Sequence, residues 1–418
     1  MAEQPRLADN TDDLAQQFRE TRLLTEALVS SLSDADASLQ SMDDTSPAKW
    51  HLAHTTWFWE TFLLRDHLPG YCLFDERWPF LFNSYYEAEG ERVARGRRGM
   101  LSRPSLDEAR DYRTHVTLAM EPLLARSDCA DLIALGIAHE QQHQELLLTD
   151  MKHGLFQNPL GSEMFAGAPP PPSGADADNA DWWEHPGGVA QAGHDGSTFA
   201  FDNEGPRHRV LLQPFALARR LVTNGEWLAF MADGGYSTSS LWLSDGWSWV
   251  QAHEVTAPLY WQAGEAGWTQ FTHSGWQEME AARPVTHISY YEADAFASWA
   301  GKRLPTEFEW EAVAQRQGAD AAFAGHQLDI AASPLPVGGT DLFGDCWQWT
   351  RSAYLPYPRF HPVAGAIGEY NGKFMSGQFV LRGASCATPR GHSRTSYRNF
   401  FYPHQRWQFT GLRLAMDL

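Results

Sequence analysis

The stretch Ser46-Pro-Ala-Lys-Trp-His-Leu-Ala-His54 predicts the start of a helix. In it, a serine that can cap a helix precedes a proline, which suits the first helical position. We expect this helix to extend to about Asp66. Its two histidines, His51 and His54, are three residues apart, so they lie on one helical face. The segment therefore predicts a helix that presents imidazole groups to a neighbour.

A second histidine pair occurs in His139-Glu-Gln-Gln-His143, with the four-residue spacing that also shares a helical face. We expect its helix to be capped by Asp128 and to run to about Lys152. Residues 11–33 have amphipathic spacing, and Ser105 with Glu108 forms a capping-box pattern. Four such helices predict a bundle, in which two histidine-bearing faces can surround a metal ion.

The rest of the chain has a different character. The connection from Pro69 to Pro104 is too rich in aromatic residues for disorder, so we expect it to fold over a site. Residues 166–181 are rich in proline, alanine and aspartate, which predicts a linker between a domain at 1–165 and one at 182–418. Glycine, proline and tryptophan recur throughout the second domain, so we expect short strands and irregular loops there. We also expect short helices that begin with capping boxes at Thr223, Ser289 and Thr306.

Composition excludes several classes of protein. A net charge of −20 over 418 residues opposes binding to nucleic acid. The sequence has no run of about 20 apolar residues to span a membrane. Residues 1–10 lack the apolar core of a secretory signal, so we expect a cytoplasmic protein. The four cysteines form no C-x-x-C pair, which argues against disulfides and a thiolate zinc site.

The histidine pairs leave alternatives open. Neutral imidazole suits iron, copper and zinc alike, and single buried histidines are often only packed. The run His139 to His143 also matches the H-E-x-x-H motif of zinc peptidases, with Glu140 as general base. The longer metzincin motif fails at Leu146 and Thr149, and Glu145 and Asp150 are too close in sequence to serve as the acidic ligand of a thermolysin-like site.

Other residues near these pairs carry suitable chemistry. Tyr85 and Tyr86 can donate a proton, and Gln142, beside His143, can hydrogen-bond a substrate. The arginines of the long connection can bind a carboxylate through two parallel hydrogen bonds; these are Arg95, Arg97, Arg98 and Arg103.

Taken in order, these motifs resemble the sulfoxide synthases of ergothioneine biosynthesis, which join a DinB-like helical bundle to a domain like the formylglycine-generating enzyme. The resemblance covers nearly the whole chain. Besides the two histidine motifs, it rests on Arg303-Leu-Pro-Thr-Glu-Phe-Glu-Trp310, Gly344-Asp-Cys-Trp-Gln-Trp349, Arg382-Gly-Ala-Ser385 and Gly411-Leu-Arg413. It implies an α+β protein, a four-helix bundle followed by a C-type-lectin-like domain.

The resemblance also implies an activity. Enzymes of this family use iron(II) and dioxygen to join a cysteine-type thiol to the imidazole of hercynine, Nα-trimethylated histidine, as a sulfoxide. The corresponding iron ligands here are His54, His139 and His143, which leaves His51 as a neighbour. Gln142 is then expected to contact hercynine, and Asn399 and Phe400 to line the same cavity.

Local sequence resembles one branch of the family. Phe82-Asn-Ser-Tyr-Tyr86 followed by Arg95 and Arg98 is similar to enzymes that accept free cysteine, which implies a catalytic role for Tyr85 or Tyr86 and carboxylate binding by the arginines. Phe400-Phe401 replaces the Trp-Asp pair of the γ-glutamylcysteine branch, so Phe401 favours cysteine. Thr388 and Ser393 stand where formylglycine-generating enzymes have copper-binding cysteines. A selenium-inserting branch acting on a selenosugar, and a non-catalytic lectin-like binding module, are the remaining alternatives.

Overall fold

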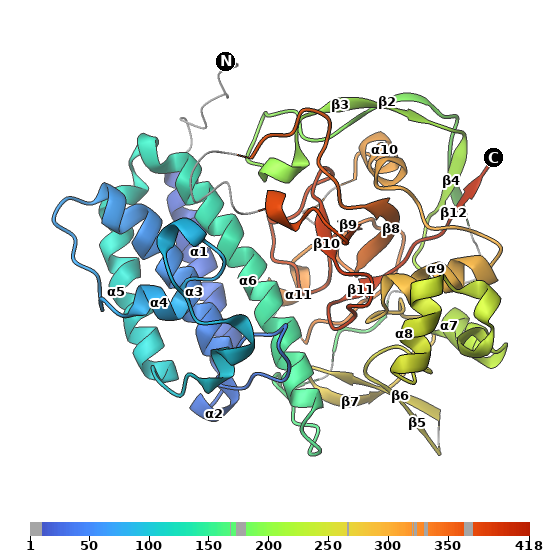
Figure 1. Cartoon of the computed structure of the whole chain (residues 1–418), viewed down its shortest axis with the longest axis horizontal. Helices are drawn as coiled ribbons and strands as arrows, with labels where there is room; N and C mark the ends of the chain where they lie inside the picture. The colour runs from blue at the N-terminus through green and yellow to red at the C-terminus, as the bar shows by residue number, and fades with distance from the viewer. Residues whose placement is uncertain are drawn as a thin grey trace. The chain divides into compact units, whose positions relative to one another are not determined.

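The structure is a computed structural model that describes residues 11–167, 169–172, 181–265, 267–319, 321, 324–329, 333–362 and 371–418. It divides into two compact units (Figure 1). The first comprises Met1–Pro159, Asp195–Asp202 and His361–Gly372, and the second comprises the remaining segments. Most of the predicted linker, at 168 and 173–180, and residues 1–10 lie outside the described residues.

The first unit is helical. Four long helices pack together: α1 contacts α5 and α6, and α3 contacts α5 and α6. A π-helical turn, Glu60–Arg65, continues α3. The helices of this unit are α1 (Thr11–Val29), α2 (Asp34–Ala37), α3 (Ala48–Trp59), α4 (Trp78–Phe82), α5 (Leu106–Leu124) and α6 (Ala130–Phe156). The predicted bundle is confirmed.

Helix boundaries confirm some cap predictions and correct others. Ser46 does not cap α3: the helix begins at Ala48, and its N-cap residue is Pro47, without a side-chain hydrogen bond. Ser105 accepts a hydrogen bond from the Glu108 amide, and the Glu108 carboxylate accepts one from the Ser105 amide, so this capping box is confirmed. Asp128 does not cap α6: the N-cap residue is Cys129, without a side-chain hydrogen bond, because a 3-10 turn at Ser127–Cys129 leads into the helix. The helix expected over 11–33 ends at Val29, since Ser33 caps the separate helix α2.

The long connection between α3 and α5 is folded. Glu60, at the end of α3, accepts hydrogen bonds from the hydroxyls of Tyr71 and Tyr112 and from the Phe74 amide. These bonds fix the start of the connection to the bundle. Further along, α4 packs on α3, and the Trp50 indole donates to the Leu81 carbonyl at 3.1 Å. The connection therefore reaches the histidine-bearing helix.

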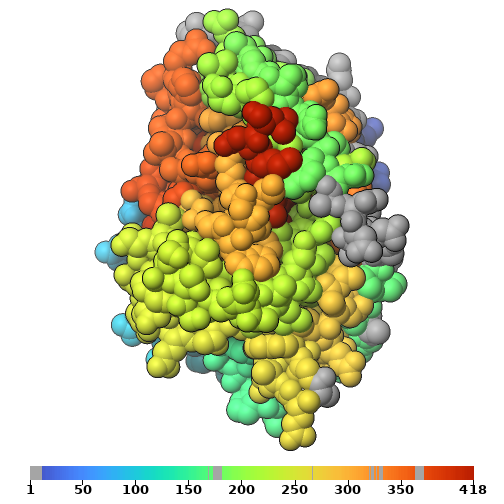
Figure 2. All heavy atoms as spheres, turned by 90° about the vertical axis from the view of Figure 1, so that its right-hand side faces the viewer, coloured from blue at the N-terminus to red at the C-terminus, as the bar shows by residue number. Residues whose placement is uncertain are grey.

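The second unit has short strands arranged in several small sheets. A four-stranded sheet has the order β10-β9-β8-β11, and two three-stranded sheets have the orders β1-β4-β12 and β5-β6-β7; β2 pairs with β3 alone. The C-terminal residues, red in Figure 2, lie at the surface, where β12 pairs antiparallel with β4. The strands are β1 (Trp182–His185), β2 (Gly188–Ala192), β3 (His208–Leu212), β4 (Phe215–Ala218), β5 (Trp261–Gly264), β6 (Gly267–Thr272), β7 (Gly275–Glu278), β8 (Trp347–Ala353), β9 (Phe379–Gly383), β10 (Asn399–Phe401), β11 (Thr410–Gly411) and β12 (Ala415–Asp417).

Short helices surround these sheets, as the sequence predicts. All three expected capping boxes are present, at the starts of α7, α9 and α10. The helices are α7 (Asn224–Ala232), α8 (Ser244–Ala252), α9 (Tyr290–Trp299), α10 (Glu307–Gln317) and α11 (His326–Asp329). The fold class, a helical bundle followed by a domain of short strands and loops, is confirmed.

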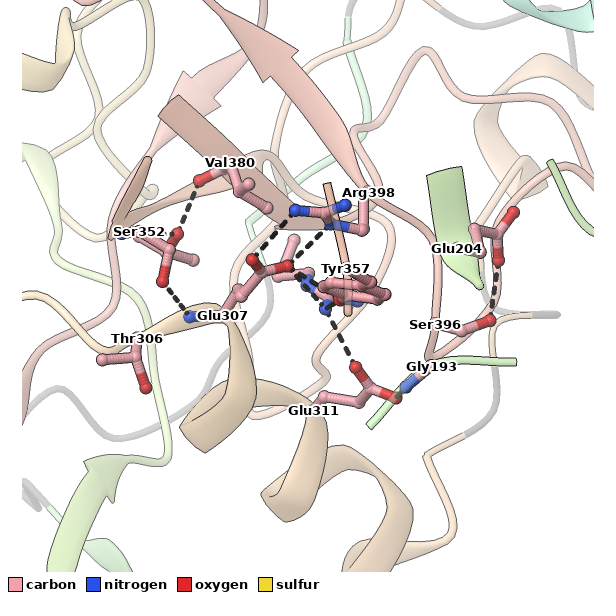
Figure 3. A network of polar contacts seen from close by, with 12 residues as sticks. Gly193, Glu204, Thr306, Glu307, Glu311, Ser352, Tyr357, Val380, Ser396 and Arg398 are labelled. Atoms are coloured by element: carbon pink, nitrogen blue, oxygen red, sulfur yellow. Dashed lines mark hydrogen bonds and ion pairs between the residues drawn. The ribbon is translucent and has the colours of Figure 1, made fainter. Parts of the chain in front are cut away.

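A buried ionic network joins α10 to the sheet of β8 and β9 (Figure 3). Arg382 donates to Glu307 at 3.0 Å and to Glu311 at 2.9 Å, and Arg398 donates to Glu307 at 2.8 Å. The Tyr357 hydroxyl also donates to Glu307. Removing one partner from such a network leaves an uncompensated buried charge. Two motifs singled out in the sequence, at 303–310 and 382–385, therefore carry residues that hold this unit together.

Candidate metal centre

Three histidines converge in the bundle. Helix α3 places His54, and α6 places His139 and His143 one turn apart. Nε2 of His54 lies 3.2 Å from Nε2 of His139, and one nitrogen from each of the three rings lies within 4.8 Å of the others. Among the histidine, cysteine, aspartate and glutamate side chains of the described residues, these three histidines are the group that is close enough together to hold a metal ion. The structure thus brings together the three residues expected as ligands.

The electrostatic environment keeps these imidazoles neutral. Burial and the neighbouring His139 lower the pKa of His54 well below its ordinary value. Burial lowers the pKa of His139 to about 3. Burial and the nearby His54 lower the pKa of His143 in the same direction. A neutral imidazole is the form that binds a metal, so at neutral pH these rings need lose no proton to do so.

Aromatic side chains and one carbonyl fix the position of His54. Its ring stacks between Trp50 and Trp57, with centroid distances of 4.5 Å and 5.5 Å. Its Nδ1 lies 2.6 Å from the Phe82 carbonyl oxygen. Because a carbonyl can only accept, Nδ1 carries the proton and donates it, which leaves the lone pair on Nε2 for a ligand. The folded connection therefore sets the orientation of this ring.

His143 is fixed by side chains instead. Its Nδ1 lies 2.8 Å from Nδ1 of His51, and Nε2 of His51 lies 3.1 Å from Oδ2 of Asp150. The same Asp150 oxygen accepts a hydrogen bond from the Ser46 amide at 2.8 Å. The role of Asp150 as a partner of His51 was not predicted from the sequence. The position of Asp150 seven residues after His143, two helical turns along the same face, was the available signal.

The donor set fits a transition metal. Three neutral nitrogen ligands on two rigid helices are suited to iron, copper or zinc, and the second ring nitrogens of His54 and His143 are held by hydrogen bonds. A hydrogen bond between Nε2 of His54 and Nε2 of His139 accounts for their separation of 3.2 Å, but it does not account for the third imidazole nitrogen, from His143, within 4.8 Å of both rings' ligand atoms. We therefore take the cluster as a metal centre that can hold one ion.

The structure contradicts the peptidase role of Glu140. Its carboxylate is fully buried and points to other helices, where it accepts hydrogen bonds from Arg22, Arg113, Thr25 and the Trp59 indole. Burial raises the pKa of Glu140, but Arg113 and Arg22 outweigh burial and hold it below its ordinary value. A general base must reach a water on the metal. This carboxylate is an internal counter-ion and cannot serve as one.

The two tyrosines lie in one aromatic stack with the site. Tyr86 is fully buried and its ring lies 5.5 Å from that of Trp57, which stacks on His54. Tyr85 is partly exposed and stacks on Tyr86 at 4.8 Å. Tyr86 is thus one ring closer to the metal ligands along this stack.

The two arginines differ in environment. Arg98 is buried, and its guanidinium carbon lies 3.4 Å from the centroid of the Trp50 ring. It donates to the hydroxyls of Ser46 and Ser84, and within the described residues it forms no ion pair. Burial and the neighbouring Arg95 lower the pKa of Arg98 to about 8. Arg95 itself is exposed. Within the described part of the chain, Arg98 is therefore a buried cation that is paired with no carboxylate, beside a tryptophan that stacks on His54.

The remaining expected site residues are described in their own units. Gln142 is partly buried on α6, next to His143. Asn399, Phe400 and Phe401 form β10 of the second unit, where Phe400 stacks on Tyr354 at 4.1 Å. Thr388 and Ser393 are buried and hydrogen-bonded to Ser385 and to the Gly383 carbonyl. No helix of the described chain is long and apolar enough to cross a bilayer.

Comparison with known proteins is consistent with both units. Residues 17–147 match the DinB superfamily, and residues 175–333 and 330–418 match the Sulfatase-modifying factor enzyme 1-like domain. Three similar relatives are each named hercynine oxygenase. The protein of Mycobacterium tuberculosis is 32% identical, over 92% of this chain and 94% of its own. That of Mycolicibacterium smegmatis is 34% identical over the same shares, and that of Mycolicibacterium thermoresistibile is 33% identical over 97% of this chain and 95% of its own. On this similarity along nearly its full length, the chain belongs to the hercynine oxygenase family.

Proposed function

We propose that this chain is an iron(II)-dependent hercynine oxygenase of ergothioneine biosynthesis, which joins a thiol to the imidazole of hercynine and forms a sulfoxide. The observation that carries the proposal is the cluster of His54, His139 and His143 in a chain with near full-length similarity to hercynine oxygenases. The reaction balances as follows: one imidazole C–H bond and one S–H bond break, a C–S and an S=O bond form, and dioxygen is reduced by four electrons with release of one water.

The proposed metal chemistry follows from the ligand set. When bound, iron(II) supplies open coordination positions at which dioxygen, the thiol sulfur and the imidazole are brought together. His54, His139 and His143 hold the ion as neutral ligands. Trp50, Trp57 and Phe58 pack on their rings and limit the entry of water. This shell keeps the ligands in one geometry.

We further propose that the thiol substrate is cysteine and that Arg98 binds its carboxylate. A buried guanidinium that stacks on Trp50 and forms no ion pair within the described residues is stabilised by an anion. Arg95 follows on the same connection and is proposed as a second, more exposed contact. Phe400 and Phe401, in place of a Trp-Asp pair, support cysteine over γ-glutamylcysteine.

For proton delivery we propose a tyrosine of the aromatic stack, with Tyr86 favoured over Tyr85 because Tyr86 packs directly on Trp57. Gln142 is proposed to hydrogen-bond the hercynine imidazole, and Asn399 is proposed as a further substrate-binding residue.

The test is product analysis. The full chain is reconstituted with iron(II) without oxygen, and then receives oxygen, hercynine and an equimolar mixture of cysteine and γ-glutamylcysteine, with mass spectrometry of the products. The proposal expects hercynylcysteine sulfoxide as the main product. A γ-glutamyl adduct would overturn the choice of thiol only. Absence of any hercynine adduct from the iron-loaded protein would overturn the proposed activity.

A further inference from the structure

His51 lies between a proposed metal ligand and a buried carboxylate. Its Nδ1 is 2.8 Å from Nδ1 of His143, and its Nε2 is 3.1 Å from Oδ2 of Asp150. The His51 side chain is 3% exposed and that of Asp150 is 6% exposed, so water does not compete for these contacts. The three side chains form a continuous chain of hydrogen bonds: His143, His51, Asp150.

The protons in this chain can be assigned from donor and acceptor rules. The Asp150 oxygen already accepts from the Ser46 amide, so it faces His51 as an acceptor. Nε2 of His51 must therefore carry a proton and donate it to Asp150. In a neutral His51 the lone pair is then on Nδ1, which accepts from Nδ1 of His143. The lone pair of His143 is left on Nε2, the atom available to a metal.

The opposite arrangement is disfavoured. If His51 carried its proton on Nδ1, the Nε2 lone pair would face the Asp150 carboxylate, and two acceptors would repel each other at 3.1 Å. His143 would then hold its own proton on Nε2, where a metal must bind. The buried carboxylate of Asp150 thus determines the tautomer of His51, and His51 in turn determines the tautomer of His143.

We propose that Asp150 and His51 position the metal ligand His143 by fixing its ring orientation and its tautomer, so that His51 is a positioning residue of the metal centre. The inference rests on the proposed function only in that His143 is taken as a ligand. His54 is oriented by a backbone carbonyl, which no substitution removes, whereas His143 depends on side chains. The orientation of His143 can therefore be changed by substituting its partner while the ligand itself is kept.

The test compares two substitutions of His51. His51→Leu removes the acceptor, while His51→Asn keeps an oxygen near the position of Nδ1 that can accept from His143. The matched control is His153→Leu, which removes another hydrogen-bonded histidine, on α6 and bonded to Ser41 at 2.7 Å. The full-length proteins are titrated with iron(II) against a chromogenic chelator, and with cobalt(II), whose absorption spectrum reports the number and geometry of its ligands.

We expect His51→Leu to weaken iron(II) binding by about 10- to 100-fold, the usual effect of losing the partner of a histidine ligand, and to change the cobalt(II) spectrum. His51→Asn should restore most of the affinity and the parent spectrum, and His153→Leu should leave both unchanged. Circular dichroism of the metal-free proteins checks that each variant is folded.

Two results would overturn the inference: parent-like affinity and spectrum in His51→Leu, or a loss in His51→Asn as large as in His51→Leu, which would assign the effect to packing. If His51→Leu fails to fold, the comparison of His51→Asn with the parent decides, since retention of affinity and spectrum supports the inference and loss of both overturns it. A parent protein that binds no iron(II) would instead refute the metal centre itself, so the two failures are distinguishable.

Discussion

At the scale of single residues, Glu140 separates two functions that the sequence alone leaves open. The H-E-x-x-H spacing makes it a candidate general base. However, its carboxylate oxygens accept hydrogen bonds from Arg22, Arg113, Thr25 and Trp59. The two histidines of the same motif, His139 and His143, converge instead with His54. A helix turns each residue by about 100°, so adjacency in a motif does not place two side chains in one site.

The first prediction concerns this carboxylate. Glu140→Gln leaves two buried guanidinium groups without their buried carboxylate, and we expect it to lower the free energy of unfolding by about 3 kcal/mol. Iron(II) stoichiometry should remain that of the parent. Urea unfolding and metal analysis check both statements. Unchanged stability together with lost activity is the pattern of a general base and would contradict our assignment.

The second prediction concerns Arg98. Arg98→Met keeps an unbranched side chain on Trp50 but removes the cation, so the KM for cysteine should rise by about tenfold or more, the usual effect of losing a charge-assisted hydrogen bond. Iron(II) affinity and the KM for hercynine should change little. Arg97→Met, an exposed arginine of the same 3-10 turn, is the control. Equal effects of the two substitutions would refute a specific carboxylate contact.

At the scale of elements, two glycines in α6 meet different neighbours. A methyl group at Gly136 would lie 2.5 Å from the buried Trp59 ring, whereas one at Gly154 would meet the end of the flexible Leu39 side chain at 2.6 Å. Leu39 is partly exposed and can move, while Trp59 is enclosed. The close approach of α3 and α6, which brings the histidines together, thus depends on Gly136.

The third prediction follows from this difference. Alanine normally stabilises a helix interior by up to about 1 kcal/mol relative to glycine. We expect Gly154→Ala to be neutral or stabilising, and Gly136→Ala to destabilise the protein by about 1–3 kcal/mol because the clash outweighs helix propensity. Thermal unfolding of the two variants beside the parent measures the sign of each effect. Stabilisation by Gly136→Ala would show that the helices can separate without cost.

Elements also show what sequence patterns can predict. Capping boxes at Ser105, Thr223, Ser289 and Thr306 are local, since the donor and acceptor lie three residues apart, and all four form. The prediction that Asp128 caps α6 was also local, and it was wrong because a 3-10 turn that includes Asp128 precedes the helix. The break between α1 and α2 depends on a competing cap at Ser33, which the apolar spacing of 11–33 conceals.

At the scale of the whole molecule, the meeting of two histidine-bearing helices was predictable because each pair lies on one helix, whereas the choice of His54 over His51 came from the family resemblance. The partners of the cluster were not predictable, because they come together only through packing. Asp150 on α6 contacts His51 on the neighbouring helix α3, and the Phe82 carbonyl contacts His54 from the long connection. The network of Glu307, Arg382 and Arg398 in the second unit was not predictable either, because these residues are distant in the sequence and meet only through packing.

The fourth prediction concerns the stability of the whole chain as a function of pH. Burial and the nearby Arg394 lower the pKa of His392 to about 3, whereas an unfolded histidine titrates at about 6.5. Between these values the unfolded chain binds a proton that the folded chain does not. The free energy of unfolding therefore falls as the pH falls from 6.5, by up to about 1.4 kcal/mol per pH unit from this group.

The variant His392→Gln isolates that contribution. Glutamine cannot titrate but can keep the hydrogen bond to the Tyr397 hydroxyl, which lies 3.0 Å from Nε2 of His392. Other titrating groups act equally in both proteins, so the difference in slope between pH 6 and pH 4 reports His392 alone. Urea unfolding of the metal-free proteins measures it. Parallel curves would show that His392 is protonated in the folded chain.

The metal centre is tested by iron(II) binding to the parent protein and to His54→Ala, His139→Ala and His143→Ala, with iron content measured after anaerobic titration and desalting. We expect about one iron per chain in the parent, loss of tight binding in each of the three variants, and parent-like binding in the control His153→Leu. Full iron occupancy in all three alanine variants would contradict this expectation, because the metal would then be held elsewhere.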